Sequence, residues 1–172
     1  MDNLITIATK REKKIESLNA HFDEANSDKF LKDEIKKLTL NKDYESLFKL
    51  KCRHTVLASL TFDQLMECLK YLKPADIYDY ARVHKLSAFE MNRLSQILIL
   101  MKDAHYIYQF MTLENAPVDM LLYGLIKTKN LKYLRLAIRS NLLANHNLSL
   151  LANEIKRIED EINASHTTDQ KL

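Results

Sequence analysis

Two similar stretches decide the fold: Ile97-Leu-Ile-Leu-Met-Lys-Asp-Ala-His-Tyr-Ile-Tyr-Gln-Phe-Met111 and Gly124-Leu-Ile-Lys-Thr-Lys-Asn-Leu-Lys-Tyr-Leu-Arg-Leu-Ala-Ile138. An apolar helix end, a Lys-Asp or Lys-Asn corner and a tyrosine-containing second helix occur in both. Self-similarity at a period of roughly 20–50 residues is typical of stacked helical repeats. A shift of 27 positions pairs Asp103 with Asn130, Tyr106 with Tyr133, Ile107 with Leu134 and Phe110 with Ala137.

The composition favours helices joined by short corners. The chain has 172 residues, of which 47% are apolar and 28% charged, with one glycine and two prolines. Sheets need more of these residues at their turns, whereas a helical protein does not. No apolar run approaches the roughly 20 residues that span a bilayer, and the N-terminal sequence lacks the apolar core of a signal peptide. We therefore expect a soluble, cytoplasmic protein without a membrane span.

Capping signals and apolar periodicity predict eight helices after residue 40. Thr61 with Gln64 and Ser87 with Glu90 both fit a capping box, in which two side chains satisfy each other's backbone amides. Pro74 suits a first helical turn because its missing N–H would be unbonded there. The predicted helices cover residues 42–53, 62–72, 75–84, 88–101, 104–112, 117–128, 131–139 and 146–162.

These helices predict an all-α fold, a right-handed α-solenoid-like stack of about four helix–turn–helix repeats with a period of about 27–30 residues. Residues 1–40 form an N-terminal helical extension or cap, residues 41–162 the repeat domain, and residues 163–172 a disordered tail. A helix over residues 3–22 carries a narrow apolar stripe. It either lies against the first repeat or forms the seam of a homodimer.

The predicted architecture resembles the α-solenoid class of ankyrin, tetratricopeptide and HEAT-type repeats. The resemblance covers about residues 40 to 162 and concerns architecture alone. The period is shorter than in those repeats, and neither the Thr-Pro-Leu-His of ankyrin nor the Trp/Gly/Tyr pattern of the tetratricopeptide is present. The resemblance identifies no named family.

No motif for catalysis, a cofactor or a metal stands out. Cys52-Arg-His54 is the nearest approach to a metal or thiolate–imidazole pattern, but residues two apart on a helix face different directions. The single glycine, Gly124, rules out a phosphate-binding loop and is better explained by a close approach of two helices. The sequence therefore predicts a protein that is not an enzyme.

The tyrosines point to a binding surface on the first helices of the repeats. Tyrosine and arginine are the residues that protein interfaces favour. The alternative is that these tyrosines only pack between repeats, with their hydroxyls in water. We predict that the protein is an adaptor, inhibitor or regulator that binds another protein through Tyr78, Arg82, His105, Tyr108, Lys132 and Arg135.

Two other functions fit the sequence. Basic residues such as Lys49, Lys51, Lys129 and Arg139 favour a nucleic-acid-binding repeat, although the net charge is only +3. The acidic last helix with its short polar tail is similar to the secretion signals of bacterial type IV effectors. That resemblance implies an effector, or an effector regulator, delivered into a host cell.

Overall fold

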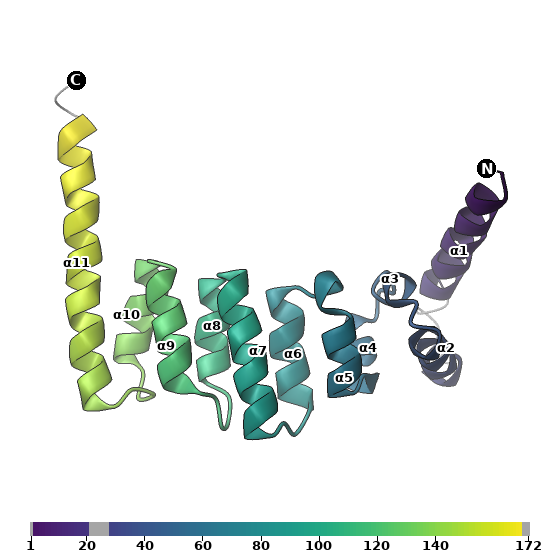
Figure 1. The fold of residues 1–172 in the computed structure, drawn as a ribbon, viewed down its shortest axis with the longest axis horizontal. Coiled ribbons are helices and arrows are strands. Elements are labelled where there is room, and N and C mark those ends of the chain that lie inside the picture. Colours follow the sequence, from purple (N-terminus) through teal and green to yellow (C-terminus); the bar gives the residue numbers. More distant parts are fainter. Residues whose placement is uncertain (1, 21–27, 170–172) are drawn as a thin grey trace. The chain divides into compact units, whose positions relative to one another are not determined.

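The computed structural model describes residues 2–20 and 28–169, and this part of the chain is built from helices without a strand. Helices account for 77% of the structure, which confirms the all-α prediction. None of the described helices combines the length and the apolar character needed to cross a membrane. The helices form two compact units, residues 1–84 and 85–172. Figure 1 shows the course of the chain.

The first unit contains six α-helices and a 3-10 turn among its described residues. The helix α2 packs on α3 and on α4, and α6 packs on α4. Leu47, Val56, Leu65 and Ile77 have no exposed surface and form its core. The elements are α1 (Asp2–Ala20), α2 (Asp28–Leu40), α3 (Tyr44–Leu47), α4 (Arg53–Ser59), α5 (Phe62–Glu67), η2 (Leu69–Tyr71) and α6 (Pro74–Val83).

The prediction of one helix over residues 42–53 is wrong, because the helix is interrupted between α3 and α4. Arg53 lies at the start of α4, and its guanidinium joins α4 to the end of α3 and to α6. It donates to the carbonyls of Phe48 and Tyr71, and its Nη2 lies 2.7 Å from Oδ2 of Asp76 on α6. Such a contact depends on residues 23 positions apart, so helical periodicity gives no sign of it. The predicted helix 62–72 is likewise split into α5 and η2.

The capping predictions hold where the side chain reaches the backbone. Thr61 with Gln64 and Ser87 with Glu90 form complete capping boxes. Pro74 occupies the first turn of α6, as its missing N–H predicts.

The second unit contains two helix pairs and one long helix. The helices are α7 (Ala88–Met101), α8 (Ala104–Met111), α9 (Val118–Lys127), α10 (Leu131–Arg139) and α11 (Asn145–Asp169). Neighbouring helices pack on each other, and α8 also contacts α10 as α7 contacts α9. At about 1.5 Å per residue, α11 is roughly 37 Å long against 14 Å for α10, and Figure 1 shows it extending well past α10.

The two helix pairs share the 27-residue equivalence that the sequence shows. Lys102 and Lys129 both adopt the left-handed backbone conformation, with φ of 57° and 53°, so the same corner ends α7 and α9. After each corner, equivalent side chains enter the core: Ile107 and Leu134, then Phe110 and Ala137, are fully buried. The repeated sequence of the second unit therefore corresponds to repeated structure.

Gly124 marks a close approach of α7 and α9, as predicted. A Cβ atom built on Gly124 would lie 2.4 Å from Cγ1 of Ile99, closer than real Cβ atoms come. The two helices contact each other at a distance that a side chain at position 124 would prevent.

The division predicted at residue 40 stays a prediction. The N-terminal helices α1 and α2 belong to the same compact unit as α6. The last helix continues to Asp169 instead of ending at residue 162, because no glycine or proline follows Asn163. The end of the helix predicted over residues 3–22 lies outside the described residues.

Candidate protein-binding surface

Four of the six predicted binding residues lie on α8 and α10 of the second unit. The carboxylate of Asp103 opens α8 by accepting from the backbone amides of His105 and Tyr106. Asn130 opens α10 at the equivalent position without a side-chain cap. Instead, Thr128 Oγ1 accepts from the Asn130 amide. The two helices contact each other, so their side chains form one continuous surface.

Tyr133 is the centre of this surface. Its hydroxyl lies 3.0 Å from Nδ1 of His105, and the two rings are 5.5 Å apart. The ring of Tyr108 lies 6.1 Å from the ring of Tyr133, and the Lys132 ammonium lies 5.2 Å from the centroid of the Tyr133 ring. Three predicted residues, His105, Tyr108 and Lys132, thus meet around Tyr133. The rings of His105, Tyr108 and Tyr133 are all half-buried. We call His105, Tyr108, Lys132 and Tyr133 the Tyr133 cluster.

The charge on this surface comes from α10. The sequence of α8 holds no acidic residue and no lysine or arginine, whereas α10 holds three cations and no acid. Arg135 pairs with Glu159 of α11 at 2.6 Å, so α11 already contacts part of this basic face. Lys132 and Arg139 are exposed, and neither forms an ion pair within the described part of the chain.

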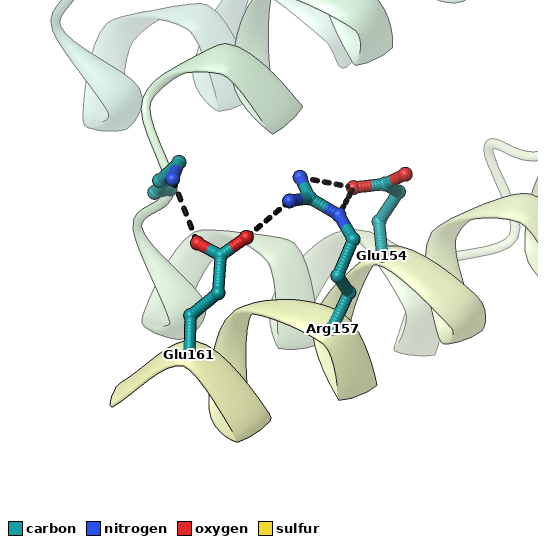
Figure 2. A network of polar contacts seen from close by, with 4 residues as sticks. Glu154, Arg157 and Glu161 are labelled. Atoms are coloured by element: carbon teal, nitrogen blue, oxygen red, sulfur yellow. Dashed lines mark hydrogen bonds and ion pairs between the residues drawn. The ribbon is translucent and has the colours of Figure 1, made fainter. Parts of the chain in front are cut away.

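A second ion network fixes α11 beside the corner that precedes α10. Figure 2 shows Glu161 on one side of Arg157 and Glu154 on the other. Glu161 also accepts a hydrogen bond from Lys129. The Lys129 ammonium lies 2.8 Å from Glu161, and this hydrogen bond is the main reason that the pKa of Glu161 falls below its ordinary value. The carboxylate of Glu154 raises the pKa of Arg157. These pairs are exposed, so each contributes little to stability and weakens with salt.

The remaining predicted residues, Tyr78 and Arg82, lie on α6 of the first unit. One turn apart on that helix, they form a cation–π contact in which the guanidinium carbon is 5.6 Å from the ring centroid. Arg82 is exposed and Tyr78 half-buried. They make a second aromatic–basic pair, which belongs to the first unit.

The cysteines have the properties of packing residues. Cys68 is buried, and burial raises the pKa of its thiol to about 11, so it is protonated at neutral pH. Burial also raises the pKa of Cys52, which precedes α4 while His54 is exposed within it. Thiolates, not thiols, are the nucleophiles and metal ligands. No group of three potential metal ligands occurs within the described residues.

Sequence reasoning missed the central position of Tyr133 and the part played by Glu159. The alignment of Tyr133 with Tyr106 marked it as a repeated position, but repetition alone does not separate a packing tyrosine from the centre of a cluster. The Arg135–Glu159 pair joins residues 24 positions apart. No local pattern predicts a contact at that separation.

No protein-family model, no curated protein and no solved structure matches this chain.

Proposed function

We propose that the protein is a non-enzymatic interaction module that binds a partner protein through the face formed by α8 and α10. The observation that carries the proposal is the Tyr133 cluster, in which three aromatic rings and an ammonium group share one half-buried surface. Rigid aromatic side chains supply a large contact area at low entropic cost, and interfaces are enriched in them. Because the cations of α10 make this face basic, the surface of the partner that contacts it is acidic or neutral.

The same proposal includes the finer architecture. This architecture is a right-handed solenoid of about four helix–turn–helix repeats, whose first helices carry the binding residues. The 27-residue equivalence within the second unit supports it, since the same corner and buried positions occur twice. Small-angle X-ray scattering tests it: an extended profile supports a stack through both units, and a compact profile contradicts it.

Nucleic-acid binding is the second candidate, and α10 is the reason to keep it. This helix is basic without an acid, and unpaired bases can stack on tyrosine rings that lie beside cations. The pairing of Arg135 and Lys129 with α11 weighs against it, because those cations are already neutralised.

Delivery as a secreted effector has less support, since Glu159 and Glu161 have a structural role in these pairs. Removing residues 163–172 would abolish delivery without unfolding the protein if that hypothesis holds.

Affinity capture with the purified chain distinguishes protein from nucleic acid. The capture is run with and without nuclease and at two salt concentrations. We expect a stoichiometric protein band that survives nuclease and the higher salt. Nucleic acid that is lost at higher salt would contradict the proposal, because the release of counterions makes phosphate contacts steeply salt-dependent.

A further inference from the structure

An open apolar groove lies between α2 and α4 in the first unit. Its volume is about 510 Å³. Ile35, which is 2% exposed, contributes to its wall, and Leu40 at the end of α2 is 72% exposed. From α4, the exposed Ala58 and Ser59 line it with small side chains. The α2 residues that line it span about 12 Å along the helix axis, or two turns.

The polar side chains of the groove have partners within their own helices. Thr39 Oγ1 donates to the carbonyl of Ile35, and Ser59 Oγ donates to the carbonyl of Val56. The side-chain oxygen of Gln64 is held by the Thr61 amide in the capping box. With these groups satisfied, the groove offers an occupant chiefly apolar contacts.

The charged residues that line the groove have one sign. Lys32 and Lys36 lie one turn apart on α2, and no acidic residue is among those that line the groove. An occupant with apolar side chains on one face and carboxylates on its flanks would complement both features. Acidic flanks would also distinguish it from basic amphipathic segments.

The N-terminal helix α1 does not supply this occupant. Lys14 of α1 pairs with Glu34 at 2.7 Å, and Glu34 lies about 200° around α2 from Lys36. The exposed part of α1 carries Lys10, Arg11 and Lys13 beside the acids Glu12 and Glu16, so α1 of a second copy has a net positive charge and lacks the acidic flanks that would complement the groove.

We propose that this α2–α4 groove is a docking site for an acidic amphipathic helix of a partner protein. A helix places apolar residues in a groove at positions i, i+3, i+4 and i+7, which two turns of α2 accommodate. The small side chains of α4 allow the backbone of the partner helix to come close. An acyl chain fits less well, because small ligands are usually enclosed over most of their surface and this groove is open along one side.

Two synthetic peptides test the proposal against the full-length chain. One is an amphipathic helix of about 16 residues with leucines at these spacings and glutamates on both flanks, and the other replaces each glutamate by lysine. Fluorescence anisotropy measures their affinities. We expect the acidic peptide to bind at least about tenfold more tightly than the basic one, and Lys32→Glu/Lys36→Glu to reverse that preference.

Two further variants locate the binding. Ala58→Trp fills the groove from an exposed position and should abolish binding, while circular dichroism confirms that the helices remain. Lys37→Glu/Lys51→Glu changes the charge by the same amount at exposed positions outside the groove and should leave the preference for the acidic peptide intact.

Several results would overturn the proposal. They are failure of the acidic peptide to bind, equal binding of the two peptides, and binding that survives Ala58→Trp. Displacement of the peptide by palmitate with equal affinity would assign the groove to an acyl chain instead. Self-association lost in Lys32→Glu/Lys36→Glu would assign it to a second copy. None of these results depends on the Tyr133 cluster, so this proposal and the proposed function succeed or fail separately.

Discussion

The contact between α4 and α6 and the contact between α7 and α9 show two ways of joining helices. In the first unit, Arg53 reaches Asp76, whose side chain is only 5% exposed, and also binds two backbone carbonyls. In the second unit, α7 and α9 meet where Gly124 has no side chain and Ile99 fills the space. The first junction depends on a charge that needs its partner, whereas the second depends on shape. The two should therefore respond differently to substitution.

Breaking the polar junction should have the largest effect. In Asp76→Ala, the half-buried guanidinium of Arg53 and the amide of Lys73 lose their acceptor. Removing one partner of a buried ion pair leaves an uncompensated charge, and we expect unfolding to require about 3 kcal/mol less. Urea denaturation followed by circular dichroism measures this. Glu159→Ala removes an exposed pair and serves as the control, with a loss of at most about 1 kcal/mol. Equal losses would contradict the distinction.

Filling the apolar junction should cost less. Gly124→Ala brings a methyl group against Ile99, and overpacking costs about 1–3 kcal/mol, partly offset by the higher helix propensity of alanine, which is about 1 kcal/mol. We expect a net loss near 1 kcal/mol. Ile99→Ala provides the space, so Gly124→Ala should become neutral or stabilising in that background. A double-mutant cycle by urea denaturation would show additive losses if the two residues did not meet.

The two equivalent corners of the second unit allow a finer comparison. Asp103 caps α8 with two hydrogen bonds, whereas Asn130 caps α10 with none. Asp103→Ala should lower the free energy of unfolding by about 1 kcal/mol. Asn130→Ala should change it by a few tenths at most. Thermal and urea unfolding of both variants check this, and a larger loss at Asn130 would contradict the observed difference between the corners.

The smallest effect concerns pH. The hydrogen bond from Lys129 lowers the pKa of Glu161 below its ordinary value of 4.5. A carboxylate with a depressed pKa stabilises the fold above its unfolded pKa, and this contribution is lost as the pH falls through the folded pKa. An NMR titration should place the Glu161 pKa below 4.5, and Lys129→Met should move it upward. An unchanged pKa in that variant would show that the pair does not form in solution.

The sequence predicts the second unit better than the first, and the reason is physical. Helix ends set by local chemistry, such as the capping boxes at Thr61 and Ser87, are predicted correctly in both units. In the second unit, the close approach at Gly124 is predicted correctly as well. The break between α3 and α4 depends on Arg53 and Asp76, which are distant in sequence. Local periodicity cannot reveal where a long polar side chain will find its acceptor.

The candidate surface shows the same division. The repeat places His105, Tyr108 and Lys132 on equivalent helices, and the structure brings them together. Their common contact, Tyr133, and the pairing of Arg135 with Glu159 require tertiary packing. Residue types at a surface can be predicted from a repeat, whereas the charges left for a partner depend on which of them α11 has already paired.

The most direct test of the proposed interface compares two matched pairs of substitutions. Lys132→Glu/Tyr108→Ser alters the Tyr133 cluster. Lys127→Glu/Tyr123→Ser removes a cation–π contact of the same kind on α9, where the ammonium lies 4.9 Å from the ring centroid. Quantitative capture of the partner by each purified variant, after circular dichroism shows intact helices, is the measurement. We predict that the first variant loses the partner and the second retains it. Retention by both, or loss by the second alone, would contradict binding through α8 and α10.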